Sequence, residues 1–233
     1  MQRGQNRPSG MFQQGHAALG IPKGASGMVR IKAFENHGSN VCICLEDGGK
    51  YWLKKTDLAD SCLAVNDEMD TEDFCQFIRI HQYPRALNQA VAMLARRPCS
   101  KGEITARLQR GKYTSEVVDL VIYKLEKEKL LNDREFCEQW VQYRLGRKYG
   151  PAFIHRELRT KGIPEDMIVS ALEDRDETDE LMNAVSLAKK AWSRAKPDSD
   201  LYKRRQKVIA SLVRKGYSWE MAKEACSTAE TDM

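Results

Sequence analysis

Long apolar stretches are absent from this sequence of 233 residues. A transmembrane helix needs about 20 consecutive apolar residues, whereas charged side chains interrupt the longest apolar runs here. The first residues also lack the basic and then apolar layout that is typical of a secretory signal. We therefore expect a cytoplasmic protein without membrane contact. Its core should be substantial, because 42% of the residues are hydrophobic.

The Cys-x-x-Cys spacing is absent as well. The seven cysteines are scattered, and none forms a Cys-x-x-Cys pair, which is the spacing that zinc ribbons need. Their odd number also argues against a framework of disulfides. We expect the cysteines to be small buried side chains in a reducing compartment, with no metal site.

Residues typical of enzyme active sites are scarce. The chain has four histidines, and none lies at metal-ligand spacing with a cysteine or an acidic residue. It also lacks the Gly-x-x-x-x-Gly-Lys-Ser/Thr loop that holds the phosphates of ATP. We therefore expect a protein that is not an enzyme, needs no cofactor and acts by binding.

The charge is divided unevenly along the chain, whose net charge is +5. Residues 28–80 have ten acidic and six basic side chains, so the positive excess belongs mainly to the part that follows. Such asymmetry favours a polyanionic or acidic partner for the C-terminal part.

The first 80 residues divide into two segments of different composition. Residues 1–27 are rich in Gly, Gln, Asn and Pro, so burial would not offset the entropy lost on ordering them, and we expect a disordered N-terminal tail. Residues 28–80 are expected to form a small antiparallel β-rich module with short helices.

Three extended segments are expected in this module, at residues 29–34, 41–45 and 50–53. Between the last two, Asp47-Gly48 should supply the positive-φ residues of a tight hairpin turn. Two short helices should follow between residues 56 and 79, the second with acidic residues at its positive N-terminal end. We therefore expect a small antiparallel sheet followed by helical connectors.

Helix start signals recur from residue 81 onward, and no further strand is expected. Ser100 and Glu103 have the spacing of a capping box, in which each side chain bonds the backbone N–H of the other residue. Pro84 and Pro151 are each expected at the first position of a helix. These signals predict about nine helices between residues 83 and 228.

Three segments of this helical part resemble one another. They align on Leu108, Leu158 and Leu212, which lie 50 and 54 residues apart, so each unit has room for three helices. Apolar residues recur at matching positions around each leucine, as on one face of a helix. Because such helices bury their apolar faces only by stacking, we expect an elongated, curved body.

The connectors within these units also match. Gly162 and Gly216 lie where a helix should end in the left-handed conformation, which costs glycine little because it has no Cβ. The first unit differs, since it has Gly111-Lys112, with the glycine one position early. Either this cap is built differently or the helix ends one residue sooner.

Characteristic strings mark the helix junctions, in chain order Arg96–Ile104, Leu130–Phe136, Tyr149–Pro151, Arg156–Ile163 and Leu212–Tyr217. In their order and spacing, these strings resemble the RecX family of regulatory proteins over about residues 81–228. The resemblance implies a mainly α fold of three tandem three-helix repeats, which we place at residues 81–133, 134–174 and 175–233. It also implies binding to the filament of the RecA recombinase and modulation of that filament, usually by inhibition.

Basic side chains gather in two runs of this helical part. Residues 140–161 have six Lys and Arg against one Glu, and residues 187–216 have ten against two Asp. Such clusters neutralise phosphates or pair with acidic protein surfaces. The candidate filament- and DNA-binding residues are Arg144, Arg147, Lys148, Arg156, Arg159, Lys161, Lys203, Arg204, Arg205, Lys207, Arg214 and Lys215.

Our first hypothesis is a monomeric regulator that binds along the RecA–DNA filament and contacts single- or double-stranded DNA there. It would suppress filament extension, ATP hydrolysis by RecA and strand exchange, and so affect recombinational DNA repair and the SOS response. The alternative is a helical DNA-binding protein that acts through its basic faces without RecA. A third hypothesis is a scaffold whose β-rich module binds a different partner.

Overall fold

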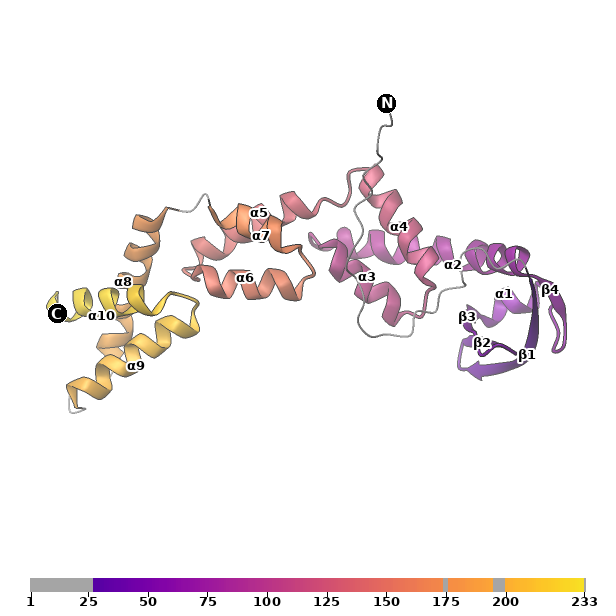
Figure 1. The fold of residues 1–233 in the computed structure, drawn as a ribbon, viewed down its shortest axis with the longest axis horizontal. Helices are drawn as coiled ribbons and strands as arrows, with labels where there is room; N and C mark the ends of the chain where they lie inside the picture. The colour runs from indigo at the N-terminus through magenta and orange to yellow at the C-terminus, as the bar shows by residue number, and fades with distance from the viewer. Residues whose placement is uncertain (1–26, 174–175, 195–199, 233) are drawn as a thin grey trace, which may run out of the picture. The chain divides into compact units, whose positions relative to one another are not determined.

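The computed structural model describes residues 27–173, 176–194 and 200–232 (Figure 1). Apart from Gly27, the predicted disordered tail lies outside the described residues. The chain divides into two compact units, one with the residues up to Gln82 together with Lys112–Val117, the other with Tyr83–Gly111 and the residues from Val118 onward. No described helix is long and apolar enough to cross a membrane.

The first unit contains the predicted antiparallel sheet, in the strand order β3-β2-β1-β4. Its strands are β1 (Met28–His37), β2 (Asn40–Leu45), β3 (Lys50–Lys54) and β4 (Glu68–Asp70), and the short helix α1 (Lys55–Ala59) follows β3 directly. Strand β4 was not predicted, because three residues with two acids show no apolar alternation. It pairs with the first residues of β1.

Strand β2 shows why the sheet forms where the pattern predicts it. Val41, Ile43 and Leu45 alternate along the strand and belong to one buried cluster, since alternate residues of a strand face the same side. Phe74 and Ile78, which lie in the long helix α2 (Thr71–Leu94) after β4, pack into this cluster. The sheet therefore has one face directed at a small apolar core.

The turn between β2 and β3 differs from the prediction. Gly48 has a φ of +90°, but Asp47 is not among the positive-φ residues. Instead, the Asp47 carboxylate accepts a hydrogen bond from the backbone N–H of Gly49 at 2.8 Å. The prediction of two consecutive positive-φ residues is therefore wrong, because this side-chain contact and a single glycine suffice to close the hairpin.

Helix α2 (Thr71–Leu94) runs through Pro84, so the prediction that a helix begins there is wrong. Its buried residues recur every fourth position at Phe74, Ile78, Gln82, Ala86 and Ala90, and one continuous buried face outweighs the hydrogen bond that proline removes. Pro84 itself is exposed. The second of the two short helices expected before residue 79 is the beginning of this longer helix.

Eight further helices lie in the remainder of the described chain. They are α3 (Lys101–Arg110), α4 (Ser115–Lys127), α5 (Asp133–Gly146), α6 (Pro151–Thr160), α7 (Glu165–Glu173), α8 (Glu177–Arg194), α9 (Leu201–Arg214) and α10 (Trp219–Thr231). The capping box of Ser100 and Glu103 and the first-turn position of Pro151 are confirmed.

The predicted alignment of the three segments is confirmed by burial. Leu108, Leu158 and Leu212 are all buried, with at most 1% of each side chain exposed. They lie on the equivalent helices α3, α6 and α9. Helices α5, α6 and α7 share one apolar cluster, and α8, α9 and α10 share another.

The connector of the first segment, in which the glycine lies one position early, is built like the other two. Helices α3, α6 and α9 end at the equivalent residues Arg110, Thr160 and Arg214, so the first helix is not shorter. Two positions later, Lys112 has a φ of +65° and Gly162 a φ of +78°. The cap therefore keeps its geometry, with lysine in the left-handed position that glycine fills elsewhere.

We expect Lys112→Gly to raise the free energy of unfolding by about 0.5–1 kcal/mol. Left-handed backbone costs a non-glycine residue about 1–2 kcal/mol, and the greater entropy of glycine in the unfolded chain offsets part of that gain. Urea denaturation measures the difference. The exposed Lys223 in the interior of α10 is the control, because Lys223→Gly should lower the stability by about 1 kcal/mol. A decrease in the free energy of unfolding of both variants would contradict the left-handed backbone at Lys112.

Candidate functional site

The start of α3 lies against the end of α6, within the second compact unit. A Cβ on Gly102 would lie 2.4 Å from the carbonyl oxygen of Lys161 and 2.9 Å from the Cα of Gly162, closer than real Cβ contacts come. The Ser100 hydroxyl donates a hydrogen bond of 2.6 Å to the same Lys161 carbonyl. Only glycine at position 102 allows this approach.

The start of α6 meets the end of α9 in the same manner. A Cβ on Gly150 would lie 2.5 Å from the carbonyl carbon of Gly216. The backbone N–H of Gly150 donates to the Lys215 carbonyl at 2.8 Å, and that of Ala152 donates to the Gly216 carbonyl at 3.1 Å. N–H groups at a helix start and carbonyls at a helix end lack intrahelical partners, and here they satisfy one another. We call these two contacts the glycine joints.

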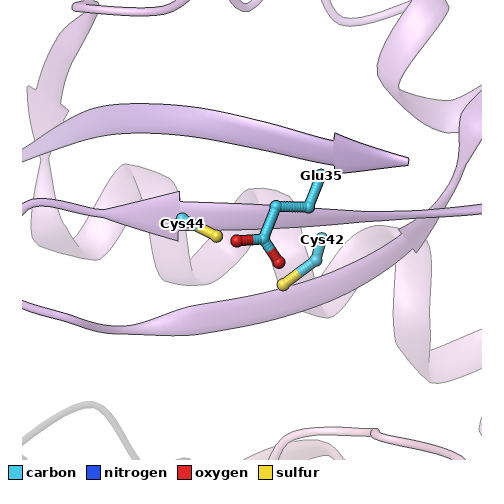
Figure 2. Close-up of side chains that lie close together, drawn as sticks. All are labelled: Glu35, Cys42 and Cys44. Atoms are coloured by element: carbon cyan, nitrogen blue, oxygen red, sulfur yellow. The ribbon is translucent and has the colours of Figure 1, made fainter. Parts of the chain in front are cut away.

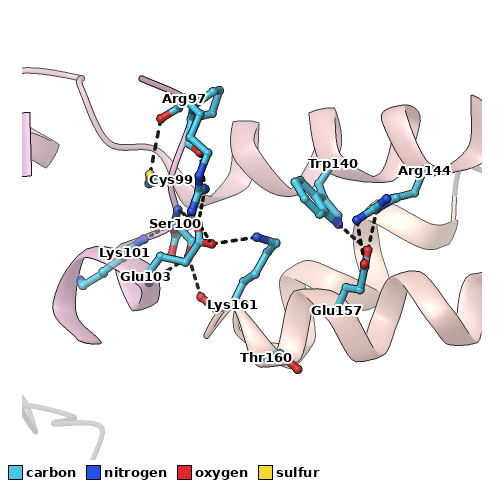
Figure 3. A network of polar contacts seen from close by, with 12 residues as sticks. Arg97, Cys99, Ser100, Lys101, Glu103, Trp140, Arg144, Glu157, Thr160 and Lys161 are labelled. Carbon is cyan, nitrogen blue, oxygen red and sulfur yellow. Dashed lines mark hydrogen bonds and ion pairs between the residues drawn. The ribbon is translucent and has the colours of Figure 1, made fainter. Parts of the chain in front are cut away.

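Glu103 links two basic residues at the first glycine joint (Figure 3). Its carboxylate accepts hydrogen bonds from Arg97 at 3.0 and 3.1 Å and from the Lys161 ammonium at 2.8 Å. Burial by itself would raise the pKa of Glu103, but the hydrogen bonds from Arg97 and Lys161 outweigh it and lower the pKa to about 2. Glu103 is therefore a fixed negative charge at the joint.

An aromatic and charged cluster lies beside this joint (Figure 3). Glu157 accepts hydrogen bonds from the Trp140 indole at 3.1 Å and from Arg144 at 2.7 Å. The Lys161 ammonium lies 4.1 Å from the centroid of the Trp140 ring, within the range of a cation–π contact. Arg144 and Lys161 are thus held by internal contacts.

Four further candidate residues also have internal partners. Arg205 forms a two-pronged ion pair with Glu230 at 2.7 and 2.9 Å, while Arg204 donates to the Trp192 carbonyl at 2.7 Å. Lys148 donates to the Ser186 hydroxyl at 2.8 Å. The Lys215 ammonium lies 4.4 Å from the centroid of the Tyr149 ring. With Arg144 and Lys161, six of the twelve predicted residues are thus held by partners within the fold, to which Arg147 and Arg156 add cation–π contacts of their own.

The other six are exposed and make no ion pair with a described acidic residue. They are Arg147, Arg156, Arg159, Lys203, Lys207 and Arg214. Two of them lie over aromatic rings, since the Arg147 guanidinium is 4.9 Å from the Tyr143 ring centroid and that of Arg156 is 5.4 Å from that of Phe153. These six remain available to a partner. Sequence spacing alone does not distinguish them from the other six.

A groove of about 420 Å³ lies between α8 and α9. Apolar side chains of both helices line it, and so do four cations, which are Lys190, Arg194, Lys207 and Lys215. No acidic residue lines it. Lys190 and Arg194 were counted in the second basic run but not among the candidate residues, because only the fold brings them beside α9. We call this feature the basic groove.

Three family models match the chain in sequence order. They describe the first three-helix domain of RecX over residues 86–125, the second over 132–172 and the third over 177–226. The chain belongs to the RecX family. The mainly helical fold predicted from the resemblance, with three three-helix domains, is thereby confirmed. The small antiparallel sheet, which the pattern of residues 28–80 predicted, precedes these domains in the chain.

Relatives of this RecX chain agree with that assignment. A protein of Bacillus pumilus named regulatory protein RecX is 28% identical over 203 residues, which cover 87% of this chain and 77% of the relative. One from Listeria welshimeri with the same name is 32% identical over 152 residues, covering 64% of this chain and 56% of the relative. The chain thus spans little more than half of the Listeria protein.

Solved RecX structures show the same fold. A crystal structure of a regulatory protein RecX superposes with a TM-score of 0.59 at 22% identity, covering 86% of this chain and 99% of that one. RecX from Lactobacillus salivarius superposes with a TM-score of 0.58 at 22% identity, over 64% of this chain and 97% of that one.

Glu103→Gln should destabilise this RecX protein at neutral pH, by about 1–3 kcal/mol, because it weakens the contacts with Arg97 and Lys161. The pKa of Glu103 in the folded chain, about 2, lies below its ordinary value of 4.5. The stabilisation is therefore fully present above about pH 4.5 and is lost as the pH falls toward 2. Urea denaturation at several pH values measures this.

The matched control is Glu128→Gln. Glu128 pairs with Lys124 on the exposed surface of the chain, where ion pairs contribute little, so this variant should change stability little at any pH. Equal effects of the two substitutions at pH 7, or a Glu103→Gln effect that persists at pH 2, would contradict the role of Glu103.

Proposed function

We propose that this protein binds the filament of the RecA recombinase and restrains it, limiting filament extension, ATP hydrolysis by RecA and strand exchange. Recombinational DNA repair and the SOS response would be affected through RecA. The match of all three helical domains to RecX models is the observation that carries the proposal. The action is one of binding and needs no catalytic group in this chain.

The charge distribution supports an acidic or polyanionic partner. Six candidate cations are exposed and form no ion pair with a described acidic residue, and four cations line the basic groove. A RecA–DNA filament offers both DNA phosphates and protein surface, and cations of this kind pair with either. The apolar floor of the basic groove favours a protein segment there, because phosphates gain nothing from apolar contact.

A second candidate function is DNA binding without RecA. The six exposed cations favour it, since each phosphate contact releases counterions and strengthens binding at low salt. It differs from the first proposal in one respect, because it requires tight binding to bare DNA. A gel shift without RecA, repeated at several salt concentrations, separates the two.

We expect the variant Lys190→Gln/Arg194→Gln/Lys207→Gln to require roughly tenfold more protein than the unaltered chain for the same inhibition of RecA. It removes three cations of the basic groove without touching the glycine joints, and each lost charge pair typically costs a fraction of a kcal/mol or more. Co-sedimentation with preformed RecA–DNA filaments and the DNA-dependent ATPase of RecA are the two readouts.

The control variant Lys112→Gln/Lys124→Gln/Lys127→Gln makes the same change of net charge away from the basic groove, on exposed residues. It should inhibit RecA like the unaltered chain. If the unaltered protein neither co-sedimented with RecA–DNA filaments nor changed the ATPase of RecA, the proposed function would be wrong. Equal losses in the two variants would show that net charge matters and not the basic groove.

A further inference from the structure

Two cysteines lie on the face of the sheet opposite its apolar core. Cys42 and Cys44 are alternate residues of β2, so they face the same side, while the apolar residues between and beside them face the core. Across the sheet, Cys42 is paired with Glu35 of β1 and with Trp52 of β3. Directly paired residues have neighbouring side chains, which brings a carboxylate to the two thiols.

The potential ligand atoms of these three residues converge (Figure 2). The two sulfur atoms and a carboxylate oxygen of Glu35 all lie within 4.8 Å of one another. Zinc binds thiolate sulfur at about 2.3 Å, so two sulfurs on one tetrahedral zinc ion are about 3.8 Å apart. Side-chain movements of roughly 1 Å therefore suffice to close such a site, because sulfur and oxygen are already grouped around one point.

His37 is the candidate for a fourth ligand, from outside the group of three whose atoms already converge. It lies two residues after Glu35 on β1, on the same face of the sheet, and its Nε2 is 3.7 Å from the Glu35 carboxylate. Its side chain is half exposed and its ring lies 4.8 Å from the ring of Trp52, the residue paired with Cys42, so a rotation that leaves this ring contact would bring it toward the thiols. Two sulfurs, one carboxylate oxygen and one imidazole nitrogen are all ligands that zinc accepts in tetrahedral sites.

The surrounding charge also fits a divalent cation. Two thiolates and one carboxylate carry three negative charges, so a bound divalent ion leaves a net charge of about −1. The Lys50 ammonium lies 3.4 Å from the Glu35 carboxylate and Lys50 is paired with Cys44, so it can balance that charge. Lys50 thus acts as a neighbour that stabilises the ligands without binding the metal.

We propose that Cys42, Cys44 and Glu35, completed by His37, form a binding site for a thiophilic divalent ion, with zinc as the best match. The site ties β1 to β2 on the side away from the core and stiffens a sheet whose buried cluster is small. It is independent of RecA binding. A search for Cys-x-x-Cys misses it, because the cysteines are spaced for a strand and the carboxylate comes from another strand.

Cobalt titration of the full, untagged, reduced chain tests this site. Cobalt(II) replaces zinc in such sites and gives thiolate charge-transfer absorption and visible bands of tetrahedral geometry. One equivalent should bind and be displaced by zinc. Cys42→Ser and Cys44→Ser should abolish the thiolate bands, and His37→Ala should weaken binding by about 10–100-fold.

Cys62→Ser is the matched control, because Cys62 is an exposed thiol outside the cluster. It should bind cobalt like the unaltered chain. Zinc should also raise the melting temperature of the unaltered chain but not that of a folded Cys42→Ser/Cys44→Ser variant. Absence of thiolate bands, their loss in Cys62→Ser, or their survival in the double variant would overturn the proposal.

Discussion

The close approach of backbone to backbone at the glycine joints is the constraint on which the helical part depends. At both joints the start of one equivalent helix meets the Lys-Gly end of the next, at distances that no Cβ permits. At the joint between α6 and α9 the contact also satisfies N–H and carbonyl groups that helix ends leave unpaired. Adjacent three-helix domains are thereby connected through main chain, which the small glycine residues make possible. Side-chain contacts of Ser100 and Glu103 with Lys161 add to this connection at the first joint.

This constraint also separates the basic residues into two groups. Lys161 lies at a joint, where its carbonyl accepts from Ser100 and its ammonium binds Glu103. Cations held in this way stabilise the fold and have little left to offer a partner. The exposed cations, including Lys190, Arg194 and Lys207 of the basic groove, make no such contacts with described acids, and they are the ones that a binding function can use.

Much of the architecture was predictable, because helix caps and apolar spacing are local signals. The capping box at Ser100 and the alignment on three leucines depend on residues within a few turns. Interactions over long separations were not predictable. Glu103 and Lys161 lie 58 residues apart, so nothing in the sequence says that they pair. The prediction that a helix begins at Pro84 was wrong for a related reason, because burial along all of α2 outweighs the local preference of proline for the start of a helix.

The most direct measurement is urea denaturation of Gly102→Ala and Gly150→Ala beside Gly146→Ala. Alanine normally stabilises a helix over glycine by about 0.5–1 kcal/mol, and a Cβ on Gly146 would meet nothing within 4 Å, so Gly146→Ala should be neutral or stabilising. At the two joints the sign should reverse, with a loss of about 2 kcal/mol or more from forced backbone movement. If all three variants had the same effect, the glycine joints would not hold the domains together.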